Sequence, residues 1–302
     1  LRLKNHFWIR KKECIGKIDK RYILKHERKE NLEVFLYKNN EFENGFDNSG
    51  IWIAVSKDTG IHWKYYYTGI VERQPVYLKW YSKLPLISEE GNIQIECALF
   101  RQISPYIHPG PAPRYKLVKD GICATFVLNT ICKDSDNDGL TDIVETKICT
   151  DIYNSDTDND GIPDNLDLNP RFNYPRTEKS RIYEAIINSE EYQGYCNQNQ
   201  DSVKYYVSDS TRTVMMITDN PDLLGVQPTN QRIIFLTKSE YNQKKSPFNE
   251  ALCEYNVSPM FKVDGMEDTY KVNYNFFLRG NVYLIIKKDK GWKFVKISTW
   301  IA

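Results

Sequence analysis

The chain has 302 residues, of which 41% are hydrophobic and 27% are charged, a composition typical of a soluble globular protein with room for two modest domains. It contains no run of about eighteen apolar residues, which excludes a membrane-spanning helix at the level of sequence. The chain begins at Leu1 without an export signal, and we expect a mature or trimmed form from which that signal has been removed.

The net charge of +1 conceals two strongly charged regions. Residues 133–167 hold eleven acidic residues and two lysines, whereas the rest of the chain holds 39 basic and 29 acidic residues. An acidic segment of this density repels itself and compacts only when cations neutralise it. The first thirty residues carry eleven basic and four acidic residues, which could contact nucleic acid, an anionic lipid or a polyanionic glycan. We favour solvated lysines on strand edges and expect no nucleic-acid partner.

Residues 1–130 are predicted to form a β-rich domain, because short apolar and aromatic runs alternate with turn residues. The aromatic content of 13% favours the same interpretation. Asp120-Gly121 predicts a tight turn between the last two strands, and the Pro- and Gly-rich segment 104–113 predicts a surface loop. The expected strands are Leu32–Leu36, Ile51–Val55, Trp63–Tyr67, Val76–Trp80, Ile93–Phe100, Tyr115–Val118 and Ile122–Leu128.

Residues 56–63 have the pattern S-x-D-x-G-x-x-W. In this pattern Asp58 would bond to the backbone of its own turn, Gly60 would take a positive φ, and Trp63 would pack beneath the turn. The segment resembles the Asp-box hairpin of sialidases and other β-propeller proteins, in which the box supports folding away from the active site. A propeller needs several copies and the chain has one, so the resemblance implies a hairpin and not a glycosidase.

Residues 131–171 are predicted to be a connector between two domains, and they contain two acidic loops. The first loop, residues 134–145, satisfies D-x-D-x-D-G-x5-E at every position. A calcium ion takes about six to eight oxygen ligands at about 2.3–2.6 Å, so alternate carboxylates, a backbone carbonyl after the glycine and a closing Glu suit it. The expected ligands are Asp134, Asp136, Asp138, the carbonyl of Leu140, Asp142 directly or through water, and Glu145.

The second loop, residues 156–167, repeats this layout 22 residues further along the chain. Its closing residue is Asp167, one methylene shorter than Glu, so we expect a tighter loop or a single coordinating oxygen, and a weaker or more Mg²⁺-tolerant site. Two such matches in succession favour two calcium sites over a solvated acidic tether. The expected ligands are Asp156, Asp158, Asp160, the carbonyl of Ile162, Asp164 and Asp167.

The two loops, with Thr150-Asp151 between them, resemble the bacterial thrombospondin type 3 repeat over residues 133–170. In that family the loops wrap around calcium ions with little secondary structure and form stiff connectors between domains or beneath a cell-surface module. The resemblance implies the ligands named above and a calcium-rigidified connector. Cys149 and Ile152 stand where the family has Gly and Pro, which puts a ligand role for Asp151 in doubt. An EF-hand or a partner-binding dockerin would need helices for which the sequence has little room.

The seven cysteines are an odd number, so at least one thiol is free or pairs between molecules. A Cys132–Cys149 disulfide would close the first acidic loop, and a Cys196–Cys253 disulfide would staple the last domain. Free buried thiols are the alternative. The remaining cysteines are Cys14, Cys97 and Cys123.

Residues 172–302 are predicted to form a small α+β domain. Apolar residues at helical spacing predict a helix over 181–192 with Ser180 as its N-cap. Separators at 279–281 and 289–291 predict that the last three strands form an antiparallel meander. The expected strands are 203–207, 213–217, 233–236, 270–277, 282–286 and 293–297. The last is expected to be a core strand with two faces, one carrying Trp292, Phe294 and Trp300 and the other Val295, Ile297 and Ile301.

No catalytic signature such as G-x-S-x-G, H-E-x-x-H, a P-loop or G-x-G-x-x-G occurs in the chain. We therefore expect a non-catalytic bacterial protein that is secreted, periplasmic or attached to the cell surface, where millimolar calcium suits sites with a Kd of about 10⁻⁴–10⁻³ M. Its partner would be an unknown protein or glycan. A toxin or antagonist module is a further hypothesis. The main alternative is a secreted hydrolase with structural calcium and two glycosidase carboxylates among Glu89, Glu90, Glu96, Glu190 and Glu191.

Overall fold

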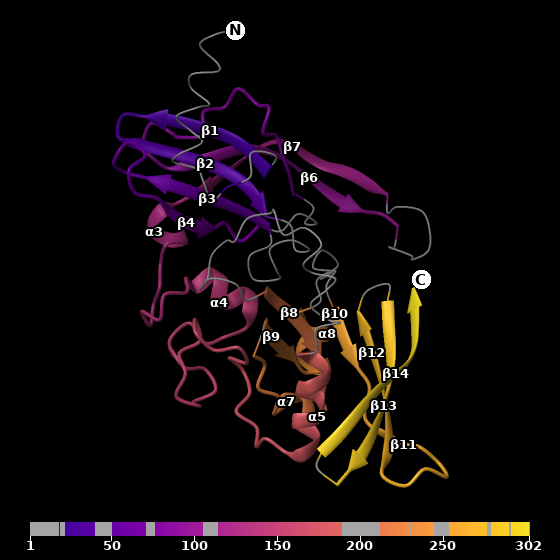
Figure 1. Ribbon diagram of the computed structural model, residues 1–302. Helices are drawn as coiled ribbons and strands as arrows, with labels where there is room; N and C mark the ends of the chain where they lie inside the picture. Colours follow the sequence, from indigo (N-terminus) through magenta and orange to yellow (C-terminus); the bar gives the residue numbers. More distant parts are fainter. Residues whose placement is uncertain are drawn as a thin grey trace, which may run out of the picture.

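The computed structural model describes Ile18 and residues 22–39, 50–70, 76–104, 114–188, 212–229, 231–244, 254–276, 279–289 and 291–301 (Figure 1). These residues form three β-sheets and a few short helices, so the predicted mainly β, α+β architecture is confirmed. Within these ranges, no helix combines the length and the apolar character needed to cross a bilayer.

The N-terminal part contains two antiparallel sheets, each with its strands paired in chain order. A short helix, α3 (Leu128–Ile131), follows the second sheet and leads into the acidic segment. The strands of the first sheet are β1 (Ile23–Lys29), β2 (Leu32–Asn39), β3 (Gly50–Ser56) and β4 (Lys64–Tyr67). Those of the second are β5 (Val76–Leu78), β6 (Ile93–Gln102) and β7 (Tyr115–Phe126).

The C-terminal part is a mixed sheet flanked by helices α5 (Glu178–Ile187), α7 (Pro221–Leu224) and α8 (Lys238–Lys244). Its strands are β8 (Arg212–Ile217), β9 (Gln231–Leu236), β10 (Glu254–Val257), β11 (Phe261–Lys262), β12 (Thr269–Phe276), β13 (Arg279–Lys288) and β14 (Gly291–Ile301). The sheet order is β14-β13-β12-β10-β8-β9, with β11 beside β12. The last three strands form the predicted antiparallel meander. Strand β8 runs parallel to β9 and β10, and apolar runs such as those of β8 and β9 are typical of parallel strands covered on both faces.

The first sheet is covered on both faces, which explains why β3 is buried along its whole length. Alternate residues of β2 and β3 face opposite ways and so belong to two different cores. One core joins the first sheet to the second and includes Val34, Leu36, Ile51, Ile53, Ile93, Ile95 and Cys97. The other core, here called the interlayer cluster, consists of Ile18, Phe35, Tyr37, Trp52, Ala54, Tyr67, Leu140, Val144, Ile148 and Ile234.

The interlayer cluster places the acidic segment between the two β-rich parts of the chain. Leu140, Val144 and Ile148 come from the first acidic loop and from helix α4 (Asp142–Ile148), while Ile234 comes from β9. The aliphatic side chains meet an aromatic face of the first sheet, and Lys147 Nζ lies 4.5 Å from the centroid of the Tyr67 ring. The acidic segment is therefore packed against folded structure and is not an isolated spacer.

The turn between β3 and β4 has the geometry expected of the S-x-D-x-G-x-x-W pattern. Asp58 Oδ1 accepts hydrogen bonds from Ser56 Oγ at 2.7 Å and from the backbone N–H of His62 at 2.9 Å. Gly60 has a φ of +94°, and Trp63 Nε1 donates to the Gly60 carbonyl at 3.0 Å. The local sequence is sufficient to specify this hairpin, because nearly all its polar contacts lie within the turn.

The predicted tight turn at Asp120-Gly121 is wrong, because residues 115–126 form one strand. Cys97 pairs with Ile122 and Leu99 pairs with Lys119, so two residues of β7 lie opposite one residue of β6. This is a β-bulge, and Gly121 takes a φ of +65° within it. The Asp-Gly pair correctly indicated a positive φ, which a bulge requires as much as a hairpin does.

Two other local predictions also need correction. Helix α5 begins earlier than expected, and its N-cap is Thr177, which accepts from the Ser180 N–H at 3.0 Å while Ser180 Oγ accepts from the Thr177 N–H at 3.2 Å. The separator predicted at 279–281 lies inside β13. The strand predicted at 203–207 and most of the loop predicted at 104–113 lie outside the described residues.

The predicted Cys132–Cys149 disulfide is also wrong, because both thiols are free. Helix α4 lies between the two residues in sequence, and Cys149 ends it in a left-handed conformation with a φ of +68°. Cys97 and Cys123 are free as well. Cys14, Cys196 and Cys253 lie outside the described ranges, so a Cys196–Cys253 pair stays a prediction.

The predicted faces of the last strand are wrong, because the pairing of β13 with β14 shifts by one residue near the middle of β14. The shift reverses the alternation of side chains, so Trp300 pairs with Gly280 on the face opposite Trp292 and Phe294. A Cβ at Gly280 would collide with the Trp300 indole. Phe294, Ile297 and Trp300 are exposed, as befits the edge strand of the sheet rather than a core strand.

The interlayer cluster predicts a large effect of truncating Ile148, which is fully buried in it. Ile148→Ala is expected to lower the free energy of unfolding by about 2–5 kcal/mol, as buried Ile→Ala changes do. Ile61→Ala, at a side chain that is 72% exposed, should change it by less than about 0.5 kcal/mol. Urea unfolding of both variants provides the measurement, and equal midpoints would contradict the packing described above.

Candidate metal centre

The two acidic loops are built alike, and helix α4 begins within the last residues of the first loop. In each loop the first three aspartates place one carboxylate oxygen apiece within 4.8 Å of one another, and all six side chains are half-buried. The two triads are Asp134, Asp136 and Asp138, and Asp156, Asp158 and Asp160. Each triad could hold a metal ion.

In each loop, one Asn and one Gly with positive φ turn the backbone so that the three carboxylates of the triad come together. Asn137 and Asn159 have φ values of +63° and +59°, and Gly139 and Gly161 have φ values of +101° and +95°. These conformations are strained for most side chains but accessible to Asn and Gly, which explains the shared D-N-D-G core. The backbone therefore turns sharply enough to bring alternate carboxylates together.

Backbone N–H groups hold the carboxylates in place. Asp134 accepts from the N–H groups of Asn137 at 2.7 Å and Gly139 at 3.1 Å, and Asp156 accepts from Gly161 at 2.8 Å. The third positions behave alike, since Asp136 Oδ1 and Asp158 Oδ1 each accept one N–H at 3.1 Å. The loops are thus preorganised, with part of each carboxylate left for another partner.

Several buried carboxylate oxygens have no hydrogen-bond partner in the described part of the chain. Glu145 is fully buried, and both of its oxygens are unpaired. Asp167 is 3% exposed, and its Oδ1 accepts from the Asn169 N–H at 2.8 Å while its Oδ2 is unpaired. Asp136 Oδ2 and Asp158 Oδ2 are buried and unpaired as well. Burying a charged oxygen without a partner is costly, and a cation at each loop removes that cost.

Glu145 and Asp167, the closing residues of the two loops, differ in how many of their carboxylate oxygens lack a hydrogen-bond partner. Glu145 has two oxygens available, as a bidentate ligand needs, whereas Asp167 has one. Whether Asp167 would bind an ion through one oxygen or two stays a prediction.

The ninth position of each loop has a role that the sequence did not reveal. Asp142 accepts from the N–H and Oγ of Ser135 at 2.8 and 2.9 Å, and from Lys133 Nζ at 2.9 Å. Asp164 accepts from the N–H and Oγ1 of Thr157 at 2.9 and 2.6 Å. Both carboxylates therefore tie the start of their loop to its far side. Their predicted coordination of the ion, directly or through water, stays a prediction.

The seventh positions are predicted to coordinate through their carbonyls, and that also stays a prediction. Their side chains differ in exposure, since Leu140 is buried in the interlayer cluster and Ile162 is 42% exposed. The first loop is thus anchored to the first sheet at the residue whose carbonyl would face the ion. The second loop is anchored elsewhere.

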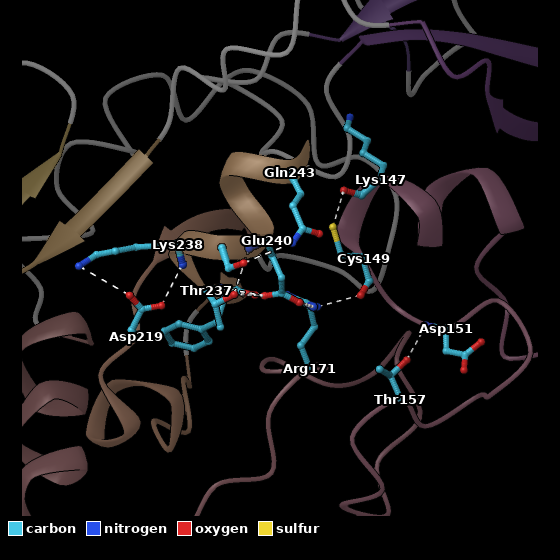
Figure 2. Close-up of polar contacts among 12 residues, drawn as sticks. Lys147, Cys149, Asp151, Thr157, Arg171, Asp219, Thr237, Lys238, Glu240 and Gln243 are labelled. Carbon is cyan, nitrogen blue, oxygen red and sulfur yellow. Dashed lines mark hydrogen bonds and ion pairs between the residues drawn. The ribbon is translucent and has the colours of Figure 1, made fainter. Parts of the chain in front are cut away.

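Two arginines anchor the second loop to the C-terminal sheet, and sequence reasoning missed both. Arg232 of β9 donates to the carbonyls of Asp167 at 2.9 Å and Asn165 at 2.5 Å. Arg171, just after the loop, donates from Nε to the Cys149 carbonyl at 2.8 Å and from Nη2 to Glu240 at 2.6 Å (Figure 2). No spacing rule links these residues, because their partners are far away in the sequence.

The buried carboxylates of the two loops carry more negative charge than their surroundings favour. Burial, followed by the charges of Asp136, Asp138, Asp164 and Asp142, raises the pKa of Glu145 to about 8. Burial is also the largest cause that raises the pKa of Asp158 to about 6 and that of Asp167 to about 6. An acidic cluster of this kind binds protons when it has no cation, and it exchanges them for a cation.

The donor set is made of oxygen atoms only, which suits hard cations such as Ca²⁺ and Mg²⁺. The orphaned buried oxygens of Glu145, Asp136, Asp158 and Asp167 fit such an ion at each loop. No protein-family model, no curated protein and no solved structure matches this chain. The evidence for metal binding therefore comes from the loops themselves.

The raised pKa of Glu145 predicts how the stability of the metal-free protein depends on pH. The folded state holds this proton up to about pH 8, whereas an unfolded Glu loses it near its ordinary value of 4.5. The stability that this proton contributes is therefore fully present below that ordinary value and is lost as the pH rises through about 8. Urea unfolding in a chelator should give a lower midpoint at pH 8.5 than at pH 6. Glu145→Gln should weaken this dependence, and an unchanged dependence would contradict the burial of this carboxylate.

Proposed function

We propose that the chain is a non-catalytic, extracytoplasmic calcium-binding protein in which two calcium ions fix the acidic segment between its β-rich parts. The observation that carries the proposal is Glu145, a fully buried carboxylate with two unpaired oxygens that faces the charges of the first triad. A divalent cation at the first loop neutralises these groups and supplies the missing partner.

Calcium is preferred to magnesium on the character of the ligands. Magnesium demands a near-octahedral shell at about 2.0–2.1 Å and keeps several waters, whereas calcium accepts many protein oxygens in a looser geometry. The first loop offers the three aspartates of its triad, the Leu140 carbonyl and both oxygens of Glu145. Such a shell is crowded for magnesium and ordinary for calcium.

The resemblance to thrombospondin type 3 repeats supports a mechanical role for the ions. Loading the first loop would fix Leu140 and α4 against the first sheet, because both belong to the interlayer cluster. Loading the second loop would fix the carbonyls that Arg232 holds against β9. The ions would thereby stiffen the junction between the two β-rich parts.

The acidic loops also support a location outside the cytosol. Calcium sites of extracellular modules have Kd values of about 10⁻⁴–10⁻³ M, which are saturated only where calcium is millimolar. Cys97, Cys123, Cys132 and Cys149 are free thiols, so disulfides give no evidence for a location outside the cytosol. The localisation rests on the loops.

A partner-binding face is best supported on the outer side of the second sheet. Tyr77, Trp80 and Tyr81 are each about half exposed or more, and the rings of Trp80 and Tyr81 meet edge to face at 5.7 Å. The segment that follows them is held by Lys25 Nζ, which donates to the Ser82 carbonyl at 3.1 Å. Exposed aromatic rings on a fixed loop suit a protein or glycan ligand.

The hydrolase alternative has no comparable support. Glu96, one of the carboxylates considered for it, forms an ion pair with Lys79 at 2.9 Å and accepts a hydrogen bond from Ser82 Oγ. These bonds lower the pKa of Glu96, which is opposite to what a general acid needs. Glu190 and Glu191 lie outside the described residues.

Calcium binding can be tested by calorimetry on chelator-treated protein. Titration with CaCl₂ is expected to give two binding events and to stabilise the fold by about 1–3 kcal/mol per site at tenfold to hundredfold excess over Kd. Asp138→Ala should abolish the event of the first loop. Asp264→Ala removes an exposed acid outside the acidic segment and should retain both events. No heat from wild-type protein, or a response to MgCl₂ as strong as to CaCl₂, would overturn the assignment of calcium.

The partner-binding face can be tested with a glycan array and the double variant Trp80→Ala/Tyr81→Ala. The variant is expected to lose at least tenfold in affinity, or about 1.4 kcal/mol, for any glycan that the wild-type protein binds. Tyr174→Ala, which removes an aromatic ring that is 43% exposed elsewhere, should bind as wild type does. Glycan binding that survives in the double variant would rule out this face.

A further inference from the structure

The two acidic loops are in direct contact, although the contacting residues are 27 positions apart in the chain. The backbone N–H of Asn165 in the second loop donates to Asp138 Oδ2 of the first triad at 3.1 Å. A Cβ at Gly139 would lie 3.3 Å from Asn165 Nδ2, so the amide rests on the glycine of the first loop. The second loop thereby orients a carboxylate of the first site.

Asn165 also brings an unused oxygen into this contact. Its Oδ1 is buried and has no hydrogen-bond partner among the described residues. An amide oxygen is a normal calcium ligand. The neighbouring Asp164 is 1% exposed, and its charge acts on Glu145 together with those of Asp136 and Asp138. The environment of the first ion therefore includes residues of the second loop.

The same short turn serves both loops. The N–H groups of Leu166 and Asp167 donate to the Pro163 carbonyl at 2.8 and 3.0 Å, so residues 163–167 fold as one unit. Its end, Asp167, closes the second site, and its centre, Asn165, touches Asp138. Arg232 holds the carbonyls of both residues. Ordering this turn around one ion would also place Asn165 for the other.

We infer that the two sites form one coupled unit, in which Asn165 completes the first site and the binding of one calcium ion raises the affinity for the other. The inference rests on the proposed function. The coupling is favourable because the first ion to bind meets the cost of ordering the shared turn, and the second does not meet it again. The two cations repel each other, so the saving in ordering cost has to exceed that repulsion for the coupling to be favourable, and the overall constant measures this balance.

Three sets of calcium affinities test the coupling. Asp158→Asn should leave only the first site, and Asp136→Asn should leave only the second. If the sites are independent, the overall association constant of the wild-type protein equals the product of the two single-site constants. We expect it to exceed that product by at least about fivefold. Titration of each protein with CaCl₂ alone gives all three values.

The role of Asn165 is tested by comparing two substitutions in the same turn. In the Asn165→Ala background, the overall constant should equal about the product of the two single-site constants measured in that same background. Leu166→Ala, at a neighbouring side chain that is 60% exposed, should keep the wild-type value. Far-UV circular dichroism in saturating calcium checks the fold, and Asn165→Gln replaces Asn165→Ala if the latter does not fold.

The outcomes separate the two proposals. Wild-type protein that binds no calcium would defeat the proposed function. Two calcium ions with an overall constant equal to the product would defeat only the coupling. Coupling that survives equally in Asn165→Ala and Leu166→Ala would show that Asn165 does not carry it.

Discussion

Carboxylate oxygens buried without hydrogen-bond donors are the constraint on which the rest of this structure depends. Glu145 has both oxygens in that condition, and Asp136, Asp158 and Asp167 each have one. These atoms are buried, and no ion pair to Glu145 occurs among the described residues. Protons or cations would compensate such charges, which would link the folded state of the acidic segment to pH and to metal.

The same segment is where the N-terminal and C-terminal sheets come together. Leu140, Val144 and Ile148 join the aromatic face of the first sheet to Ile234 of β9. Arg171 (Figure 2) donates to the Phe235 carbonyl of β9, and Arg232 of β9 donates to the Asp167 carbonyl of the second loop. A connector that hangs free between domains would have polar, solvated surroundings. Here Leu140, Val144 and Ile148 are buried against folded structure, so a metal ion bound at the first loop would bear on how the two β-rich parts hold together.

The candidate metal loops and the aromatic residues proposed for binding belong to different parts of the molecule. Tyr77, Trp80 and Tyr81 belong to the second sheet and its following loop, whereas Leu140, Val144 and Ile148 of the acidic segment pack on the first sheet. In the proposed function, metal ions would stabilise the junction of the two β-rich parts, and the exposed aromatic residues would bind the partner. Substitutions in the metal loops should leave the exposed aromatic residues unchanged, and substitutions of those aromatic residues should leave metal binding unchanged.

The sequence by itself determined the features whose causes are local. The spacing of the two Asp triads, the Asn-Gly turns within them, the hairpin at 56–63 and the antiparallel meander all follow from residues close together in the chain. Only the tertiary structure decided the burial of Glu145, the contact of Asn165 with Asp138, the two arginine anchors and the side of the sheet on which Trp300 lies. These depend on which distant segments meet, and a single extra residue in β14 is enough to reverse a face that period-two alternation had assigned.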